Sequence, residues 1–360
     1  MKIGILTFHN VPNYGAVLQA FALKSFVEKN FDAKTFIVDY KCVGNDDSFK
    51  NIKQSFYKIN NVLKRIYKIA QFDFYIGRKY DYKIIKFEDF KKSYLSVSEL
   101  KDTLKDFDVI LCGSDQIWNP RITNGFQDVY FGVKKPKTTK YISYAASCGD
   151  ISEFSVQEKE NLLRLVKNLD AIGVREKSLS DYLTLNGVSN EINVDPTMLL
   201  NKNDYKMLFN LQENNEQYVL VYALQYNSDL FKLAEIISKK RKLKIKAISG
   251  YIPTKKPKKY EMFDASPKDF LNYFFNAKYI ITNSFHGLAF SIIFRKDFNI
   301  ILPNSRSARL KDLLKEISLE DRIVEDEKII DGAINYDKVE PALNIIINKS
   351  KDYLKKGIGR

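Results

Sequence analysis

Residues 3–27 read IGILTFHNVPNYGAVLQAFALKSFV. The apolar run Ile3–Phe8 is short and is followed by the turn-rich segment His9–Tyr14, a pattern typical of a buried strand. Gly15 then opens a series of apolar residues at helical spacing, and Thr35–Tyr40 has the composition of a second strand. A strand, a helix and a strand in this order predict a parallel α/β sheet.

The alternation of strands and helices occurs twice along the chain. Further strands are predicted at 107–112, 141–146, 171–175, 192–194, 218–222, 244–249, 279–282 and 298–302. The series restarts after a seam at 197–217, so we expect an α/β fold of two doubly wound, Rossmann-like lobes facing each other across a cleft. The expected lobes are 1–200 and 201–360, with a C-terminal helix, Val339–Lys356, packing back toward the first lobe. Residues 49–93 are expected to form one or two long helices whose aromatic residues serve packing.

The composition is that of a folded protein with a basic surface. Of the 360 residues, 45% are apolar, which excludes intrinsic disorder. The net charge of +14 favours nucleic acid, an anionic membrane surface or a polyanionic small molecule. No basic stripe with interleaved aromatic residues occurs, so nucleic acid is not expected. Peripheral contact with an anionic membrane surface stays open beside the simpler interpretation of the lysines as a solvated surface.

The cysteines and the first residues bear on the compartment. Cys42, Cys112 and Cys148 lack the spacing of a zinc site or a redox motif, so we expect a reducing compartment without disulfides. The N-terminal apolar run is too short for a signal peptide, and no stretch has the about 20 apolar residues of a membrane span. We therefore expect a cytoplasmic protein. Without GxGxxG, a P-loop or a metal-ligand spacing, neither a cofactor nor a metal is expected.

Two polar segments follow predicted strands of the first half. Pro12–Ala16 is a tight turn into a helix, whose N-terminus suits an anion or a sugar hydroxyl, or is an ordinary strand–helix turn. Cys112–Pro120 places amide, carboxylate and indole groups directly after a buried strand. A flat indole beside polar groups suits a sugar, and the alternative is a capping segment with a packed Trp118.

Two further segments carry ionisable groups. Arg175 ends a predicted strand, where it could bind phosphate or carboxylate, or form a structural salt bridge. His286 follows a predicted strand and precedes Gly287 and an apolar helix, which places it at a helix N-terminus facing the cleft. An imidazole there could serve as a general acid or base, could bind an anion, or could be structural. His9 also follows a strand and is the weaker candidate.

Six short motifs, in order, resemble the polysaccharide pyruvyl transferase family. They are Asn13–Ala20, Gly113–Asn119, Val174–Ser178, Asp195–Leu200, Thr282–Gly287 and Arg309–Leu314. The resemblance implies a fold like the two-lobed GT-B glycosyltransferases, phosphoenolpyruvate as donor, a sugar as acceptor and a ketal as product. The expected acceptor is a bacterial surface polysaccharide or its lipid-linked oligosaccharide precursor. Alternatives are a GT-B glycosyltransferase using a nucleotide sugar and a catalytically silent glycan-binding relative.

The resemblance also implies roles for residues. The first lobe is expected to bind the acceptor and the second the donor, with His286 moving protons between them. Many members carry a basic residue two positions before this histidine, where this chain has Ser284, so the donor's charge must be met elsewhere. The expected catalytic residues are His286 and Asp115. The expected donor-binding residues are Arg175, Arg306, Arg309, Ser284 and Gly287. The expected acceptor-binding residues are Asn13, Tyr14, Gly15, Ser114, Gln116, Trp118 and Asn119.

Overall fold

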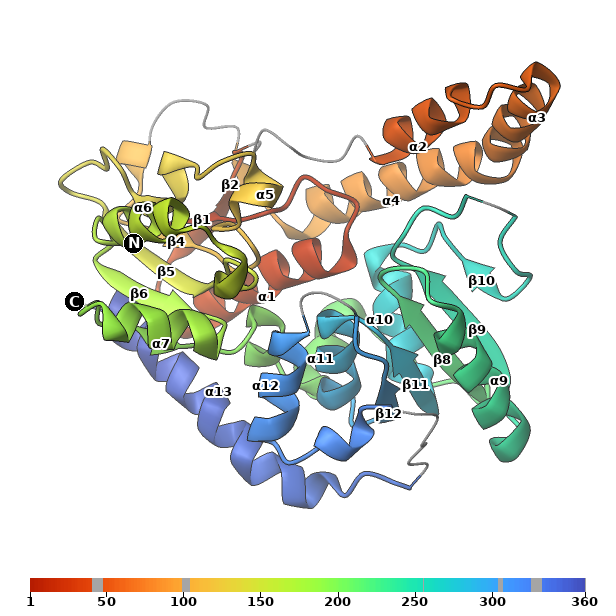
Figure 1. Cartoon of the computed structure of the whole chain (residues 1–360). Coiled ribbons are helices and arrows are strands. Elements are labelled where there is room, and N and C mark those ends of the chain that lie inside the picture. The colour runs from red at the N-terminus through yellow and green to blue at the C-terminus, as the bar shows by residue number, and fades with distance from the viewer. Residues whose placement is uncertain (41–47, 99–103, 255, 304–306, 325–331, 360) are drawn as a thin grey trace.

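The computed structural model describes residues 1–40, 48–98, 104–254, 256–303, 307–324 and 332–359. Within these residues the chain forms two α/β lobes, each built around one parallel sheet (Figure 1). The first sheet has seven strands and the second has five. None of the described helices is long and apolar enough to cross a membrane.

The first sheet has the strand order β3-β2-β1-β4-β5-β6-β7. Strand β1 (Lys2–Leu6) pairs in parallel with β2 (Lys34–Val38) on one side and with the central strand β4 (Val109–Cys112) on the other. Chain connections leave β1 and β4 in opposite directions, so their carboxyl ends form a switch point, where open sheets bind ligands. The remaining strands are β3 (Val97–Ser98), β5 (Lys140–Ala146), β6 (Ala171–Val174) and β7 (Glu191–Ile192).

The second sheet repeats this pattern in the order β10-β9-β8-β11-β12. Its switch point lies between β8 (Tyr218–Ala223) and β11 (Tyr279–Thr282). The other strands are β9 (Lys244–Ser249), β10 (Glu261–Met262) and β12 (Asp297–Ile300). Two doubly wound lobes confirm the predicted fold class. Cys112 and Cys148 are buried free thiols, and Cys42 lies outside the described residues.

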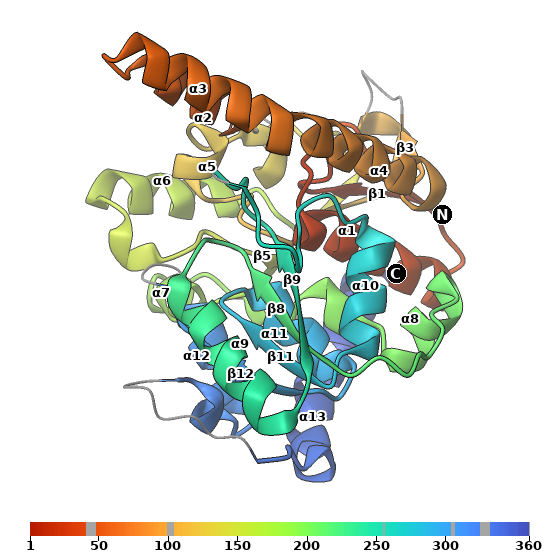
Figure 2. The same cartoon turned by 90° about the vertical axis from the view of Figure 1, so that its right-hand side faces the viewer.

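Helix α1 (Tyr14–Asn30) lies between the two lobes, and Figure 2 shows it beside α10 (Pro267–Asn276). Tyr14 stacks on Phe270 with ring centroids 4.7 Å apart, and its hydroxyl donates a hydrogen bond of 2.8 Å to the carbonyl of Ala265. Contact with both lobes explains why α1 is apolar on most of its circumference.

The other helices of the lobes cover the two sheets, and the last one returns to the first lobe. These helices are α5 (Pro120–Thr123), α6 (Val156–Val166), α7 (Lys177–Leu185), α8 (Lys202–Phe209), α9 (Ser228–Arg241), α11 (Phe285–Ile293), α12 (Ala308–Glu316) and α13 (Tyr336–Ile358). In α13, the Tyr353 hydroxyl donates to the Ser143 carbonyl at 2.8 Å, and Ser350 Oγ accepts from the Val194 amide at 2.9 Å. Helix α13 therefore packs on β5 and on the segment after β7.

The region expected to form one or two long helices forms three. They are α2 (Ser48–Tyr57), α3 (Val62–Phe72) and α4 (Arg78–Tyr94), with a π-helical turn at Asp73–Gly77 before α4. Asn61 causes the first break, because its side chain accepts a hydrogen bond from the Lys64 amide and so begins a new helix. Helices α2 and α3 and the outer part of α4 project from the lobes (Figures 1 and 2). We call residues 51–82 the arm.

Candidate active site

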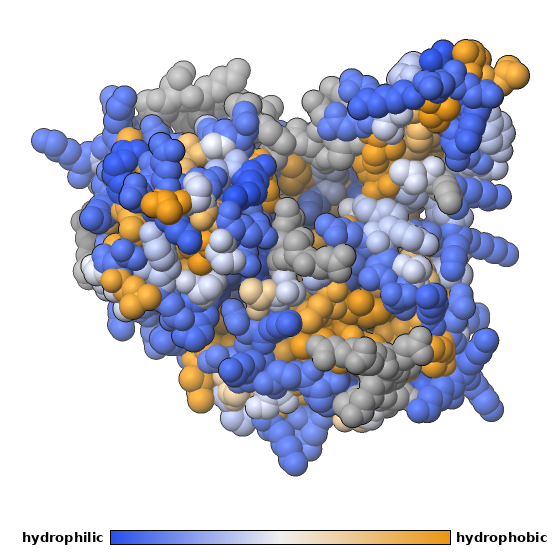
Figure 3. All heavy atoms as spheres, viewed as in Figure 1, coloured by the Kyte–Doolittle hydropathy of each residue, from blue (hydrophilic) through white to orange (hydrophobic). Residues whose placement is uncertain are grey.

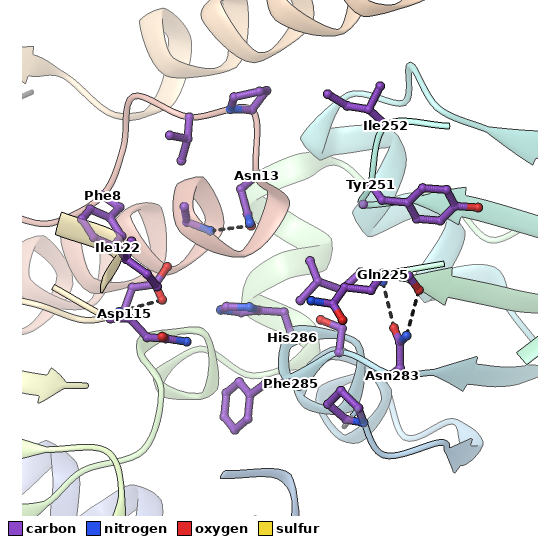
Figure 4. A pocket seen from close by; sticks show the side chains of 18 of the residues that line it. Phe8, Asn13, Asp115, Ile122, Gln225, Tyr251, Ile252, Asn283, Phe285 and His286 are labelled. Carbon is purple, nitrogen blue, oxygen red and sulfur yellow. Dashed lines mark hydrogen bonds between the residues drawn. The ribbon is translucent and has the colours of Figure 1, made fainter. Parts of the chain in front are cut away.

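A cavity of about 600 Å³ lies between the lobes, at the switch points of both sheets. The first lobe contributes the segments after β1 and β4, and the second contributes those after β8, β9 and β11 and the start of α12. Figure 4 shows Asp115 on the first-lobe side, Gln225, Tyr251 and Asn283 on the second-lobe side, and His286 between them. Both sheets therefore point their ligand-binding ends at one space.

The backbone around this cavity is fixed by two amide side chains. Asn283 joins two loops of the second lobe, because its Oδ1 accepts from the Leu224 amide and its Nδ2 donates to the Gln225 carbonyl, both at 2.9 Å. Asn13 caps α1 by accepting from the amides of Gly15 and Ala16, at 2.9 and 3.3 Å. The capped N-terminus of α1 thus faces the cavity and adds a partial positive charge there.

His286 lies at the N-terminus of α11 and packs against the N-terminus of α1. Ser284 is the N-cap of α11, and its Oγ accepts from the Gly287 amide at 3.5 Å. The imidazole fills the space beside Gly15, since a Cβ atom built on that glycine would lie 2.1 Å from His286 Nδ1. Only 12% of the His286 side chain is exposed. The missing side chain at Gly15 therefore sets the position of the ring.

A buried carboxylate lies against the other ring nitrogen. Asp195 Oδ2 is 3.5 Å from His286 Nε2 and 2.6 Å from an Arg175 Nη atom. Both contacts are within ion-pairing distance, although neither has hydrogen-bond geometry. Asp195 Oδ1 accepts from the amide and the hydroxyl of Thr197, at 2.9 and 2.7 Å. These partners hold the carboxylate in one orientation.

Asp195 is ionised at physiological pH. Burial alone would raise the pKa of this carboxyl, but Arg175, His286 and the Thr197 hydroxyl together hold the pKa well below its usual value. A permanent negative charge beside Nε2 favours the tautomer that carries its proton on Nε2. His286 is therefore prepared to exchange a proton at Nδ1, the nitrogen beside Gly15.

Arg309 brings a cation to the cavity from α12. Its side chain is 13% exposed, and its Nε lies 3.7 Å from Glu176 Oε1. The ring of Phe285 lies 5.3 Å from the Arg175 guanidinium carbon and 5.5 Å from that of Arg309. Burial raises the pKa of Glu176, although Arg309 and Arg175 oppose that shift. Because Arg309 lines the cavity together with His286, it is the arginine placed to meet an anionic ligand there.

Asp115 and Gln116 line the same cavity from the first lobe. Asp115 has a positive φ of 71°, and its Oδ1 accepts from the Gln116 amide at 2.8 Å. Gln116 Oε1 accepts from Asn119 Nδ2 at 2.9 Å, and Asn119 in turn caps α5. Gln116 thus lines the cavity, whereas Asn119 does not line it and holds the Gln116 side chain in place through this hydrogen bond.

The prediction that Trp118 presents its indole to a sugar is wrong. The side chain is fully buried, stacks on Phe131 with centroids 5.3 Å apart, and donates from Nε1 to the Tyr130 carbonyl at 3.3 Å. The segment Cys112–Pro120 alternates between cavity and core, so its largest apolar side chain packs inward. The alternative of a packed tryptophan is the correct one.

Four other predicted ligand residues have structural contacts instead. Tyr14 is 1% exposed and joins the lobes, as described above. Ser114 is fully buried, donates to the Ala145 carbonyl and accepts from Arg175. Gly287 allows close packing, because a Cβ there would lie 2.2 Å from Thr282 Oγ1. Ser284 lines the cavity but is 1% exposed, and its role is the cap of α11. These positions shape the site without presenting side chains freely to a ligand.

Arg175 does not line the cavity that contains His286. Its guanidinium is paired with Asp195, which matches the salt-bridge alternative, and it stands behind the histidine. Its Nε and Nη1 make no hydrogen bond to any described residue. It lines a second space of about 570 Å³, on the other side of Phe285 and Arg309, together with Asn193 and Leu313. Arg306 lies outside the described residues.

The structure assigns different roles to Asp195 and His9 than the sequence indicated. Asp195 was recognised only as part of a motif, although it follows a strand just as the four candidate segments do, and that position was the available signal. His9 is buried, with Nδ1 3.1 Å from the Thr7 carbonyl and Nε2 3.2 Å from Asp39. His9 is therefore held within the first lobe.

The two parallel sheets and the cavity between them define a protein of the two-lobed, GT-B-like α/β class. A family model described as polysaccharide pyruvyl transferase matches residues 13–305, so the chain belongs to that family. None of the curated proteins compared with the chain matches it.

Solved structures of similar overall shape are UDP-GlcNAc 2-epimerases. The enzyme from Neisseria meningitidis bound to UDP-GlcNAc is 10% identical, with a TM-score of 0.44 over 99% of this chain and 94% of that one. The enzyme from Methanocaldococcus jannaschii in complex with UDP-GlcNAc and UDP is 14% identical, with a TM-score of 0.42 over 97% and 93%. Likeness at this level says nothing about the substrate or reaction of this chain.

Proposed function

We propose that the enzyme transfers a pyruvyl group from phosphoenolpyruvate to two hydroxyls of a sugar, forming a ketal. The acceptor is a bacterial surface polysaccharide or its lipid-linked oligosaccharide precursor. The observation that carries the proposal is His286, oriented by Asp195 and Gly15 at the wall of a cavity that Arg309 also lines. Membership of the polysaccharide pyruvyl transferase family supports the reaction type.

The donor carries a phosphate and a carboxylate close together, and both need cationic partners. Ser284 stands where many relatives carry a basic residue, so the charge must come from another element. Arg309 enters the same cavity from α12, and the N-termini of α1 and α11 add partial positive charge. We assign the donor's anionic groups to Arg309 and these helix ends. Arg175 acts behind them by holding Asp195.

The reaction balances with proton transfers at one imidazole. A proton adds to the methylene carbon of phosphoenolpyruvate, which turns this carbon into a methyl group and makes the central carbon electrophilic. A sugar hydroxyl attacks that carbon and loses its proton. A second hydroxyl then displaces inorganic phosphate and closes the ketal, and its proton leaves with the phosphate or passes to a base.

His286 fits the first two transfers. With Nε2 facing the ionised Asp195, Nδ1 donates a proton to the methylene carbon and then takes the proton of the attacking hydroxyl. Asp115 lines the opposite side of the cavity, where it is the candidate base for the second hydroxyl. Gln116 and Asn13 are the neighbouring polar groups that we assign to the acceptor.

The decisive experiment is incubation of the purified protein with phosphoenolpyruvate and a panel of soluble and lipid-linked sugars. Phosphate release and mass spectrometry of the products are followed together, because a pyruvyl ketal requires both. In the variant His286→Gln, we expect turnover to fall by roughly 10²–10⁴-fold, since Gln can hold an anion but cannot exchange a proton. The thermal midpoint should stay close to that of the unchanged protein.

The chain offers a matched control, because it has only one other histidine. His9→Gln changes a buried imidazole that does not line the cavity, so it should affect stability and leave turnover per folded molecule nearly unchanged. A His286→Gln protein with retained turnover would move the acid to Asp115. Absence of phosphate release from phosphoenolpyruvate with every acceptor, together with transfer from a nucleotide sugar, would replace the proposal with a glycosyltransferase.

A further inference from the structure

The arm exposes large apolar side chains at its outer end. In α3, Val62, Leu63, Ile66 and Tyr67 are 52%, 81%, 58% and 63% exposed. Their spacing of one, four and five residues puts them on one side of the helix. Phe74, in the π-helical turn that follows, is 76% exposed. This side of α3 is turned away from the rest of the protein.

The inner side of the arm already has its packing partners. Phe72 and Ile76 are buried together with Phe263 of the second lobe, and Phe56 packs against them. The arm is therefore anchored on the second lobe. Its exposed apolar residues are separate from this buried cluster and are not part of the core. Figure 3 shows apolar side chains at the end of the arm surrounded by hydrophilic ones.

The arm is also strongly basic. Residues 51–82 contain seven Lys and Arg but only two acidic residues, which are Asp73 and Asp81. One of the two, Asp73, is already paired with Lys53 at 2.9 Å. Lys64, Arg65 and Lys68 alternate with the exposed apolar residues of α3. An apolar side bordered by lysines and arginines is the composition of helices that lie in the interface of an anionic membrane.

We propose that the arm docks the enzyme on an anionic lipid surface, with α3 inserting its apolar side chains among the headgroups. A second copy of the chain is the other occupant to consider. Two arms packed against each other would bring like charges together with few carboxylates to offset them, whereas anionic headgroups complement the charge. Lys64 and Arg65 border the apolar side of α3, and their long stems can reach the headgroups while α3 lies in the surface.

The docking site is connected to the candidate active site. Ile52 of α2 and Tyr80 of α4 line the cavity that contains His286, so the inner part of the arm forms one edge of its mouth. A lipid-linked sugar is held at the membrane by its lipid tail. It would reach the mouth of the cavity at the place where the arm binds the membrane. This link to the acceptor rests on the proposed function, whereas membrane binding itself does not.

Membrane binding is tested by co-sedimentation of the full-length protein with vesicles, without donor or acceptor. We expect binding to vesicles of phosphatidylcholine with phosphatidylglycerol, weak binding to phosphatidylcholine alone, and weakening by salt. Leu63→Asp should weaken binding about tenfold or more, because an inserted leucine is replaced by a charge. Lys64→Glu should weaken it at least about fivefold, since each unit charge near the surface counts for about that factor.

Two matched variants control for exposure and charge. Leu185→Asp changes an 86% exposed leucine of α7, and Lys356→Glu changes an exposed lysine of α13, both away from the arm. These proteins should bind vesicles as the unchanged chain does. Equal binding by arm and control variants, or none by the unchanged chain, overturns the proposal. So does a change in oligomeric state on Leu63→Asp without lipid, because the arm would then hold a second copy.

A comparison of soluble and membrane-bound acceptors tests whether the arm brings the enzyme to a lipid-linked sugar. Leu63→Asp should leave turnover on a soluble sugar unchanged and reduce turnover on a lipid-linked sugar in vesicles. Loss of both would mean that the arm is needed for the site itself, which overturns the docking role. Lack of activity in the unchanged chain would refute the proposed function and leave the vesicle result standing.

Discussion

Gly15→Ala tests whether the position of His286 controls the reaction. A methyl group at residue 15 would lie 2.1 Å from His286 Nδ1 and 2.3 Å from Cε1. Nonbonded carbon atoms approach to about 3.5 Å, so the ring must move by roughly 1 Å or more. The ring is the end of a side chain and can move, so the protein should still fold. Alanine also favours the helix over glycine by about 1 kcal/mol, which offsets part of the strain.

The expected result of Gly15→Ala is loss of turnover with stability retained. A displacement of about 1 Å at a reacting group costs roughly 10²-fold in rate. The assay is phosphate release from phosphoenolpyruvate with a saturating acceptor, with thermal unfolding measured on the same preparation. Gly332→Ala is the matched control, because a Cβ there meets no atom of the described residues within 4 Å.

A double-variant cycle identifies the histidine as the affected group. In a His286→Ala background the obstacle to the new methyl group is gone, so Gly15→Ala should have almost no further effect on turnover. The reasoning is refuted if Gly15→Ala keeps full turnover. It is refuted equally if the two losses multiply, because the glycine would then act independently of the ring.

Three further outcomes follow from the same structure. Arg309→Ala should raise the Michaelis constant for the donor by about ten- to hundredfold, the factor expected for a charge-assisted hydrogen bond, with the acceptor's constant little changed in steady-state kinetics. Trp118→Phe should lower the unfolding temperature through lost packing and the lost hydrogen bond to Tyr130, without raising the acceptor's Michaelis constant. Burial, with Lys202 and Lys278 nearby, lowers the pKa of Lys296 from 10.5 to about 8. Folding thus favours the neutral amine, so stability should rise as pH increases from 8 to 10.5, and Lys296→Met should add roughly 1–3 kcal/mol at pH 7 and little near pH 10 in chemical denaturation.

The fold could be predicted because its signals are local. Buried parallel strands are short apolar runs bounded by turns, and β9, α10 and β11 begin and end where the residue pattern indicates. Residues 49–93 were harder, because α2, α3 and α4 have similar composition and only the cap at Asn61 separates the first two. The exposed aromatic residues of the arm could not be told from packed ones, since exposure depends on what lies opposite.

The candidate site could be predicted only as a set of segments. Position after a strand brought His286, Asp115 and Gln116 to one cavity, because the carboxyl ends of parallel strands meet at one edge. The sequence does not indicate which way each side chain points. The prediction that Trp118 binds a ligand is therefore wrong, because its side chain is in the core. The ion pairs of the site could not be predicted from the sequence either. Arg175 and Asp195 are twenty residues apart, and only the packing of the lobes brings both to His286.

The position of α1 limits how these enzymes can be divided or recombined. Residues 14–30 belong to the first lobe by sequence, yet Tyr14 stacks on Phe270 and its hydroxyl satisfies the carbonyl of Ala265. A fragment cut near residue 200 would leave the second lobe with an uncovered aromatic face, so it should aggregate rather than fold. A chimera that takes its first lobe from one relative and its second lobe from another must therefore carry α1 and α10 from the same parent. Exchange of the loops at the cavity keeps this contact between the lobes, whereas exchange of a whole lobe breaks it.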